Sequence, residues 1–166
     1  MKRRIQKLDD VDWNAWVADD PATLVYIVRD GRVLLIRKKR GLGAGKINAP
    51  GGRQDESETL VECAVREVEE ELRITPSEIE PIGENLFQFV DGYSLHAHVF
   101  RASEFAGTPT ETDEAIPIWF DVDKLPYDEM WEDDRLWVPH VFARTRFTGR
   151  YIFDDERMLD HEIRLL

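Results

Sequence analysis

The chain has 166 residues, which is enough for one domain with a buried core. Its 34 acidic and 22 basic residues give a net charge of -12, which argues against sequence-independent binding to DNA or RNA. One cysteine excludes an internal disulfide framework, and no stretch approaches the ~20 apolar residues that span a bilayer. Because no apolar segment follows the basic residues 1–4, no secretory signal is expected. We therefore expect a cytoplasmic protein, monomeric or weakly dimeric, that binds neither membranes nor nucleic acid polymers.

Residues 1–20 are predicted to form an N-terminal extension, and residues 21–166 the main domain. Trp13 and Trp16 lie among aspartates in the extension, which either forms a short amphipathic turn on the domain or contacts a partner. The first alternative is favoured. Two apolar, β-branched runs, 22–29 and 32–37, follow and are separated by Asp30-Gly31. This dipeptide favours a two-residue turn, so the sequence predicts a β-hairpin.

Residues 38–52 break this periodicity with five glycines and a proline, so their backbone can approach a ligand closely. Thr59 and Glu62 then form the capping box T-x-x-E, which predicts that a helix begins there. We expect its core-facing side to be an apolar stripe of Val61, Val65, Val68 and Leu72. Cys63 is interpreted as a small packing residue, because a thiol is a poor Mg²⁺ ligand.

The same helix presents Glu67, Glu70 and Glu71 together, because residues three and four apart are neighbours on one face. Their charges repel, and a bound cation would reverse the sign of this interaction. Clustered carboxylates suit Mg²⁺ or Mn²⁺, whose remaining positions are filled by phosphates and water. Taken alone, a Glu-rich helix is more often a solvated face, and the i,i+4 pair of Glu62 and Arg66 fits that alternative.

Segments 81–90 and 93–102, split by Asp91-Gly92, predict a second hairpin with Phe87 and Phe89 on one face. His96 and His98 also share a face of this hairpin. Two histidines at this spacing could ligate a metal, but the sequence shows no third partner, so packing or surface roles are favoured.

The last third of the chain predicts an acidic loop over 107–116, a strand over 116–122 and a helix over 131–146. Pro139 is expected to kink or interrupt that helix. Two closing strands are predicted at 151–153 and 158–165, around a turn at residues 154–155. Two hairpins and two helices indicate an α/β fold with a mixed sheet between the helices.

The spacing of Gly52, Glu58 and the run 66–71 (REVEEE) resembles the Nudix box, a glycine, a glutamate and R-E-x-x-E-E at fixed intervals. This resemblance implies a Nudix-type α/β/α sandwich. Arg73 stands where the pattern has a second glycine. That glycine would serve as a left-handed helix C-cap, where another residue costs about 1 kcal/mol.

Outside the box, residues 38–46 (KKRGLGAGK), Asn48 and 130–134 (MWEDD) are similar to the oxidised purine nucleoside triphosphatase branch of that family, the human-type 8-oxo-dGTP diphosphatases. The resemblance implies a metal centre for Mg²⁺, or Mn²⁺, held by Gly51, Glu67, Glu70, Glu71 and Glu114. It implies a nucleotide pocket lined by Thr23, Lys38, Asn48, Phe87, Phe89, Trp131, Asp133 and Asp134. Leu42 and Ile47 depart from this branch, which has aromatic residues there, and less stacking surface can loosen base choice.

The implied activity is Mg²⁺-dependent hydrolysis of oxidised purine nucleoside triphosphates, such as 8-oxo-dGTP, to the monophosphate and pyrophosphate, which removes damaged nucleotides from the pool. Glu67, Glu70 and Glu71 would be catalytic, with one glutamate accepting the proton of water, and Arg66 would orient them. Alternatives are hydrolysis of RNA 5′ ends, ADP-ribose or dinucleoside polyphosphates, or a nucleotide-binding regulator without catalysis.

Asp133 and Asp134 allow two interpretations. As an isolated pair, one is more often a helix N-cap while the other favours the positive end of the helix. The resemblance favours base recognition instead. Two adjacent carboxyls beside Trp131 cannot both ionise cheaply, so one is expected to keep its proton and donate a hydrogen bond to a base.

Overall fold

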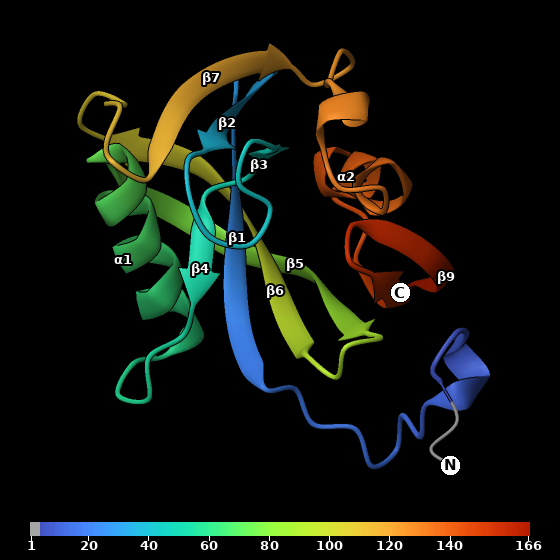
Figure 1. Cartoon of the computed structure of the whole chain (residues 1–166). Coiled ribbons are helices and arrows are strands. Elements are labelled where there is room, and N and C mark those ends of the chain that lie inside the picture. Colours follow the sequence, from blue (N-terminus) through green and yellow to red (C-terminus); the bar gives the residue numbers. More distant parts are fainter. Residues whose placement is uncertain (1–3) are drawn as a thin grey trace.

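The computed structural model describes residues 4–166, and Figure 1 shows their arrangement. Within this range one mixed sheet has the strand order β3-β2-β1-β6-β5-β8-β9, with β4 paired to β1 and β7 to β2. The strands are β1 (Asp20–Arg29), β2 (Arg32–Lys38), β3 (Ile47–Asn48), β4 (Gly51–Arg53), β5 (Thr75–Phe89), β6 (Ser94–Ala106), β7 (Ala115–Asp121), β8 (Phe147–Asp154) and β9 (Arg157–Leu165). The helices are α1 (Leu60–Leu72) and α2 (Asp134–Phe142), with short 3₁₀ turns η1 (Leu8–Asp10) and η2 (Tyr127–Glu129).

Both predicted hairpins are present. β1 and β2 pair in antiparallel fashion across Asp30-Gly31, whose φ angles of 52° and 74° are those that a tight two-residue hairpin turn requires. β5 and β6 pair in the same way on either side of Asp91-Gly92. The hairpins are joined through the parallel pair β1 and β6, which sets Thr23 opposite His98. This junction places the two hairpins side by side at the middle of the sheet.

The helices cover opposite faces of the sheet, as expected for the predicted sandwich (Figure 1). α1 packs through Ala64, Val68 and Leu72 on a buried cluster that includes residues of β1 and β2. On the other face, α2 packs through Trp137, Val138 and Val141 on a larger cluster rich in aromatic side chains. Burial of apolar surface on both faces, at about 25 cal/mol per Å², fixes the two helices to the sheet.

The capping box of α1 is confirmed, because the Thr59 hydroxyl accepts from the Glu62 amide while the Glu62 carboxylate accepts from the Thr59 amide. The expected apolar stripe is wrong at its first position. Val61 is 48% exposed and Val65 is only partly buried, whereas Ala64, Val68 and Leu72 are fully buried. The fully buried side chains are spaced four residues apart, at positions 64, 68 and 72. Val61 lies at the margin of the face that they form.

The predicted C-terminal elements need correction. The helix expected over 131–146 is only Asp134–Phe142, and Pro139 lies inside it. The chain then enters β8 at Phe147, four residues before the predicted strand. β8 pairs in parallel with β5, setting Tyr151 opposite Phe87. A parallel partner more than sixty positions away in sequence leaves no local turn signal, which is why the start of this strand was missed.

The described part of the N-terminal segment packs on the domain, in agreement with the favoured interpretation. The Leu8 amide donates to Asp160 at 2.8 Å, and the Trp16 indole N–H donates to Gln88 at 2.9 Å. The Arg150 guanidinium lies 5.4 Å from the centre of a Trp13 ring. In residues 4–166, none of the helices is long and apolar enough to cross a membrane.

Replacing Arg73 with glycine should stabilise the protein. Arg73 ends α1 in the left-handed conformation, with φ 61° and ψ 30°, which a side chain disfavours. We expect Arg73→Gly to raise the free energy of unfolding by about 0.5–1 kcal/mol, measured by urea denaturation. Arg73→Ala is the control, because it removes the charge but keeps the Cβ atom. An equal gain in both variants would attribute the effect to charge and contradict the prediction.

Candidate active site

The acidic helix α1 packs against two glycines of β4, and β4 pairs with β1. The Gly51 amide donates to the Glu71 carboxylate at 2.8 Å. A Cβ atom added to Gly52 would collide with the carboxyl group of Glu67, and one added to Gly51 would collide with the carbonyl oxygen of Thr23. Only glycine fits at position 51, where the clash is with backbone, whereas a side chain at position 52 would displace the Glu67 carboxylate. The close approach of backbone to helix holds Glu67 and Glu71 in place.

Carboxylate oxygens of Glu67, Glu70 and Glu114 all lie within 4.8 Å of one another, and we call these three residues with Glu71 the acidic centre. Glu114 joins from the loop that precedes β7. Glu71 is only 3% exposed. Burial raises its pKa to about 8, although the hydrogen bond from Gly51 opposes that shift. Burial also raises the pKa of Glu67, against the nearby charge of Arg66.

Arg66 orients several glutamate side chains through hydrogen bonds. Its guanidinium donates two hydrogen bonds to Glu58, of 2.7 and 2.8 Å, and others to Glu67 at 2.9 Å and Glu70 at 3.2 Å. Hydrogen bonding to Arg66 lowers the pKa of Glu58 to about 2. One planar donor group thus fixes three glutamates, which agrees with the orienting role expected for it.

The donor set fits a hard divalent cation. It consists of carboxylate oxygens, which Mg²⁺ and Mn²⁺ prefer, crowded closely enough that their mutual repulsion favours a positive ion between them. The nearby thiol of Cys63 is a soft ligand that Mg²⁺ disfavours, and its sulfur lies 3.4 Å from the hydroxyl of Thr23 and 3.6 Å from the carbonyl oxygen of Gly52. Cys63 is fully buried, as expected of a packing residue, and is no part of the set.

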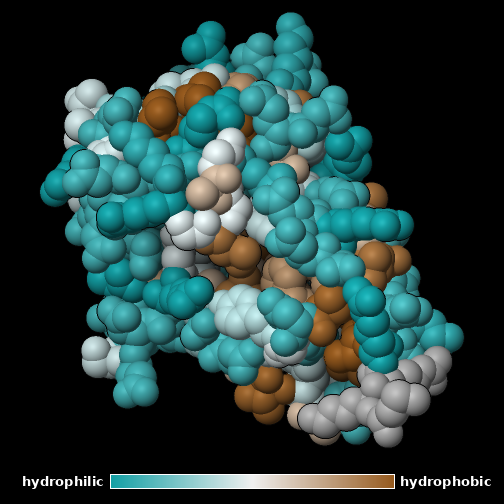
Figure 2. Space-filling model, viewed as in Figure 1, coloured by the Kyte–Doolittle hydropathy of each residue, from teal (hydrophilic) through white to brown (hydrophobic). Residues whose placement is uncertain are grey.

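A cavity of about 490 Å³ adjoins the acidic centre through Gly51, Gly52 and Glu71. It opens in the middle of the molecular face that Figure 2 shows, where apolar side chains lie at the bottom of a hollow with a hydrophilic rim. All eight residues of the predicted nucleotide pocket line this cavity: Thr23, Lys38, Asn48, Phe87, Phe89, Trp131, Asp133 and Asp134. The structure thus brings together residues from β1, β2, β3, β5 and the start of α2.

Aromatic side chains form one wall of the cavity. Phe87 stacks on Tyr151 with ring centres 4.9 Å apart, and Trp131 meets the ring of Phe153 edge-on at 5.6 Å. The glycine loop closes against this wall, since a Cβ atom on Gly43 would lie 2.7 Å from the Trp131 indole nitrogen. Such flat, apolar surfaces suit a nucleobase.

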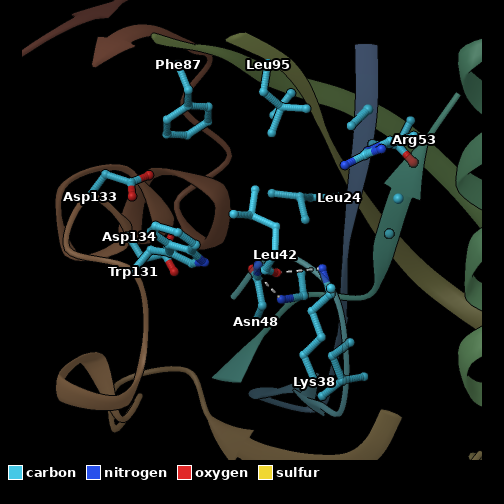
Figure 3. A pocket seen from close by; sticks show the side chains of 18 of the residues that line it. Leu24, Lys38, Leu42, Asn48, Arg53, Phe87, Leu95, Trp131, Asp133 and Asp134 are labelled. Atoms are coloured by element: carbon cyan, nitrogen blue, oxygen red, sulfur yellow. Dashed lines mark hydrogen bonds between the residues drawn. The ribbon is translucent and has the colours of Figure 1, made fainter. Parts of the chain in front are cut away.

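Polar groups lie on opposite sides of the cavity (Figure 3). Asp133 and Asp134 stand beside Trp131, while Lys38 and Arg53 lie across from them. The Asn48 amide oxygen accepts from the Ala49 amide at 2.8 Å, so its amide nitrogen can donate to a ligand. Lys38 donates to the Leu42 carbonyl at 2.8 Å, and burial lowers its pKa while the charge of Glu71 opposes this.

The two aspartates are not used as helix caps. Asp133 occupies the N-cap position of α2 without a side-chain cap bond and instead accepts the Trp137 indole N–H at 2.7 Å. Asp134 is 3% exposed, and one of its oxygens has no hydrogen-bond partner among the described residues. Burial raises the pKa of both, and the charge of Asp133 raises that of Asp134 further. Burial therefore favours one shared proton, so that one carboxyl of the pair donates and the other accepts.

Sequence reasoning missed several residues that line the cavity. Leu24, Tyr93, Leu95 and Arg53 also line the cavity. Strand alternation could have found Leu24 and Leu95, because each lies one position away from a residue on the opposite face. Thr23 lines the cavity as predicted, and its hydroxyl also lies 3.4 Å from the sulfur of Cys63 on α1.

The fold and the acidic centre fit a hydrolase of phosphate anhydrides, and comparisons agree. Residues 19–141 match the NUDIX domain, so the chain belongs to the Nudix family of pyrophosphohydrolases. It is 43% identical over 143 residues to an oxidized purine nucleoside triphosphate hydrolase from Danio rerio, covering 85% of this chain and 92% of the relative. A mouse protein of the same name is 39% identical over 81% of this chain and 86% of the relative. The MutT protein of Bacillus halodurans shares the fold, with a TM-score of 0.77, 24% identity and coverage of 87% of this chain and 97% of that one.

The buried aspartate pair should make stability depend on pH. Because the folded state raises the pKa of Asp134, it favours the protonated form, and the free energy of unfolding must fall as pH rises above the usual aspartate range. Asp134→Asn removes the cost of ionising a buried carboxyl at high pH. We expect the variant to gain stability over wild type more at about pH 8 than at about pH 4, measured by urea denaturation.

Asp128→Asn provides a control at a side chain that is 99% exposed, and it should not reproduce this difference. A gain for Asp134→Asn that is the same at both pH values would show that Asp134 is ionised throughout.

Proposed function

We propose that the protein hydrolyses oxidised purine nucleoside triphosphates, 8-oxo-dGTP among them, to the monophosphate and pyrophosphate, with Mg²⁺ as cofactor. The observation that carries this proposal is the aspartate pair, one donor and one acceptor, at the aromatic end of a cavity whose other end meets the acidic centre. The two relatives named above, from Danio rerio and mouse, support the choice of substrate.

The cavity orients a nucleotide in one direction. The base fits between Phe87 and Trp131, because the aromatic wall is apolar and the aspartates beside it offer hydrogen bonds. The triphosphate fits toward Lys38 and Arg53, whose positive charges face the opposite side (Figure 3). This orientation brings the phosphates to the acidic centre, which adjoins the cavity at Gly51 and Gly52.

At the acidic centre, Glu67, Glu70, Glu71 and Glu114 would hold the cation. Bound Mg²⁺ supplies positive charge that neutralises the phosphates and favours ionisation of an attacking water. Arg66 keeps Glu67 and Glu70 in place, which limits the reorganisation that the reaction requires. One carboxylate of this centre would accept the proton of that water.

The base-recognising end explains a preference for an oxidised purine. Oxidation at C8 changes the hydrogen-bonding edge and the tautomer preference of guanine. A carboxyl and a carboxylate side by side can donate to one such atom and accept from another, and their shared proton can lie on either. Leu42, which lines the cavity and is 42% exposed, offers less stacking surface than an aromatic residue would. We therefore expect a real but moderate preference.

Glu70→Gln and Glu71→Gln should each lower kcat by on the order of 10²-fold or more at saturating Mg²⁺, since each removes charge from the cation site. Glu69→Gln is the matched control on the same helix, because Glu69 is exposed and its side chain bonds only with Thr75 among the described residues. The rate of pyrophosphate release from a panel of nucleotides measures kcat in all three variants. Near-normal turnover in both variants would remove these glutamates from the mechanism.

Wild type should have a higher kcat/KM for 8-oxo-dGTP than for dGTP, and Asp133→Asn and Asp134→Asn should each change this ratio. An asparagine cannot pass its donor hydrogen to its neighbour, so either substitution fixes the donor and acceptor pattern. The same assay measures both nucleotides. Should wild type treat them equally and both variants keep that ratio, the protein is a broader nucleotide pyrophosphohydrolase and the sanitation role fails.

A further inference from the structure

A second cluster of metal-ligating side chains lies on the opposite face of the sheet from the nucleotide cavity. His96 and His98 project from one face of β6, while Leu95 and Ala97 between and beside them line the cavity on the other face. Glu84 of β5 lies directly opposite His98 in the antiparallel register. Neighbouring strands therefore supply the third group that the histidine pair lacks in the sequence.

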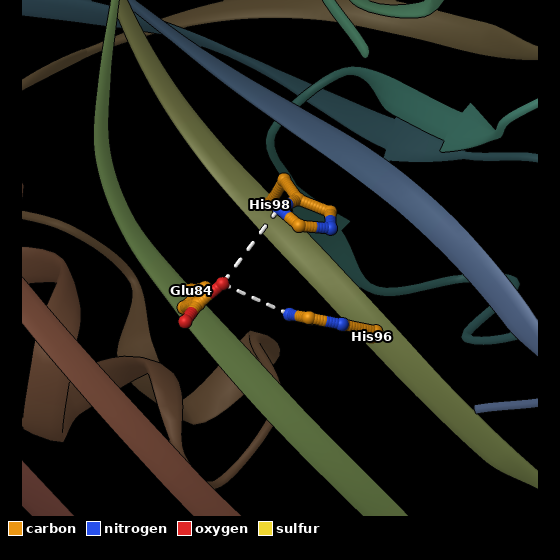
Figure 4. Close-up of side chains that lie close together, drawn as sticks. All are labelled: Glu84, His96 and His98. Atoms are coloured by element: carbon orange, nitrogen blue, oxygen red, sulfur yellow. Dashed lines mark hydrogen bonds and ion pairs between the residues drawn. The ribbon is translucent and has the colours of Figure 1, made fainter. Parts of the chain in front are cut away.

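The three side chains converge (Figure 4). One oxygen of Glu84, Oε2, lies 3.0 Å from His96 Nε2 and 3.9 Å from His98 Nδ1. The two imidazole rings stack with centres 4.1 Å apart, so both aim at the same carboxylate. One potential ligand atom from each residue lies within 4.8 Å of the others. Atoms that share one zinc ion at bond lengths of about 2.0–2.2 Å are about 3–3.5 Å apart, so small side-chain rotations would complete the site.

A purely structural hydrogen bond explains only part of this arrangement. It accounts for Glu84 and His96 at 3.0 Å, but a distance of 3.9 Å leaves His98 outside hydrogen-bond range of the same oxygen. Two protonated rings this close would also repel each other, so the pair favours at least one neutral ring with a free lone pair. A cation between the three groups would use that lone pair and the carboxylate together.

The charge of Glu84 also lacks the partner that nearby glutamates have. On the same hairpin, Glu80 pairs with Arg144 at 3.2 Å and Glu104 with Arg29 at 3.6 Å. Within the described residues, Glu84 forms ion pairs only with the two histidines. Among the described residues, the cluster therefore has a carboxylate and two imidazoles without an ion pair to lysine or arginine, and Arg146 borders the hollow beside the cluster.

An ion can reach the cluster. The side chain of Glu84 is 42% exposed, and those of His96 and His98 are 29% and 22% exposed. Glu84 and His98 line an open hollow of about 230 Å³, which Leu60 at the start of α1 also borders. Three protein ligands leave further coordination positions facing this hollow for water or an external ligand.

From this geometry we propose that Glu84, His96 and His98 form a second metal site, for Zn²⁺ or another late first-row divalent cation. Imidazole nitrogens with one carboxylate suit such ions, whereas the all-oxygen acidic centre suits Mg²⁺. The site shares no residue with the acidic centre, and its hollow borders Leu60 at the start of α1, whereas the glutamates of the acidic centre begin about two turns later at Glu67. Bound metal would clamp β5 to β6, the hairpin that carries Phe87 and Phe89 into the nucleotide cavity, and would stabilise the folded protein by linkage.

Zinc titration of the full-length protein by calorimetry, with saturating Mg²⁺ present, tests this proposal. We expect one strong site in wild type, and at least a tenfold loss of zinc affinity in each of Glu84→Gln, His96→Ala and His98→Ala. His161→Ala is the matched control, because His161 is an exposed histidine on β9, and it should keep the wild-type affinity. Glu70→Gln should also keep it, since that substitution alters only the acidic centre.

Imidazole NMR of the wild-type protein provides a readout that does not depend on how well the variants fold. Zinc should shift the ring resonances of His96 and His98 and leave those of His140 and His161 in place. Unchanged His96 and His98 resonances would overturn the proposal. So would zinc binding that survives all three cluster substitutions or disappears in Glu70→Gln, because the ion would then be held elsewhere or at the acidic centre.

Discussion

The fit of Glu67 and Glu71 against two glycines of β4 is the contact on which the rest of this site depends. Without side chains at Gly51 and Gly52, the helix α1 approaches the backbone closely enough for one amide to bond Glu71. The same strand pairs with β1, which forms part of the nucleotide cavity. One close backbone approach therefore fixes the distance between the cavity and the carboxylates, and a single methyl group there would separate them.

That approach gathers negative charge at a cost, which the surrounding residues offset. Burying carboxylates is unfavourable unless they are paired or hydrogen-bonded, and Arg66 bonds three glutamates while Arg40 pairs with Glu114 at 2.9 Å. Among the described residues, the Glu71 carboxylate accepts a hydrogen bond only from the Gly51 amide, and burial raises its pKa to about 8. The centre is thus arranged so that a divalent cation replaces a proton.

Local patterns in the sequence were sufficient where neighbours along the chain decide the structure. The Asp-Gly turns specify both hairpins, Thr59 and Glu62 specify the start of α1, and Arg73 marks its left-handed end. Long-range pairing was not visible. The predicted two-residue turn at 91–92 would set Asn85 opposite His98, whereas four residues separate the strands and set Glu84 there, and the start of β8 depends on β5. The eight predicted pocket residues came from a resemblance, and the pairing of β1 with β6 is what brings them together.

The aspartate pair shows why such a site must be built on a strong core. Two fully buried carboxyls at the start of α2 forgo the cap bond that Asp133 would otherwise make, and one oxygen of Asp134 has no partner among the described residues. The aromatic cluster around Trp137, Tyr26 and Phe147 supplies the compensating burial on the same side of the sheet. The unpaired oxygen of Asp134 lowers the stability of the free protein, but a nucleobase can form a hydrogen bond with it. Bases that form this bond are then favoured over bases that cannot.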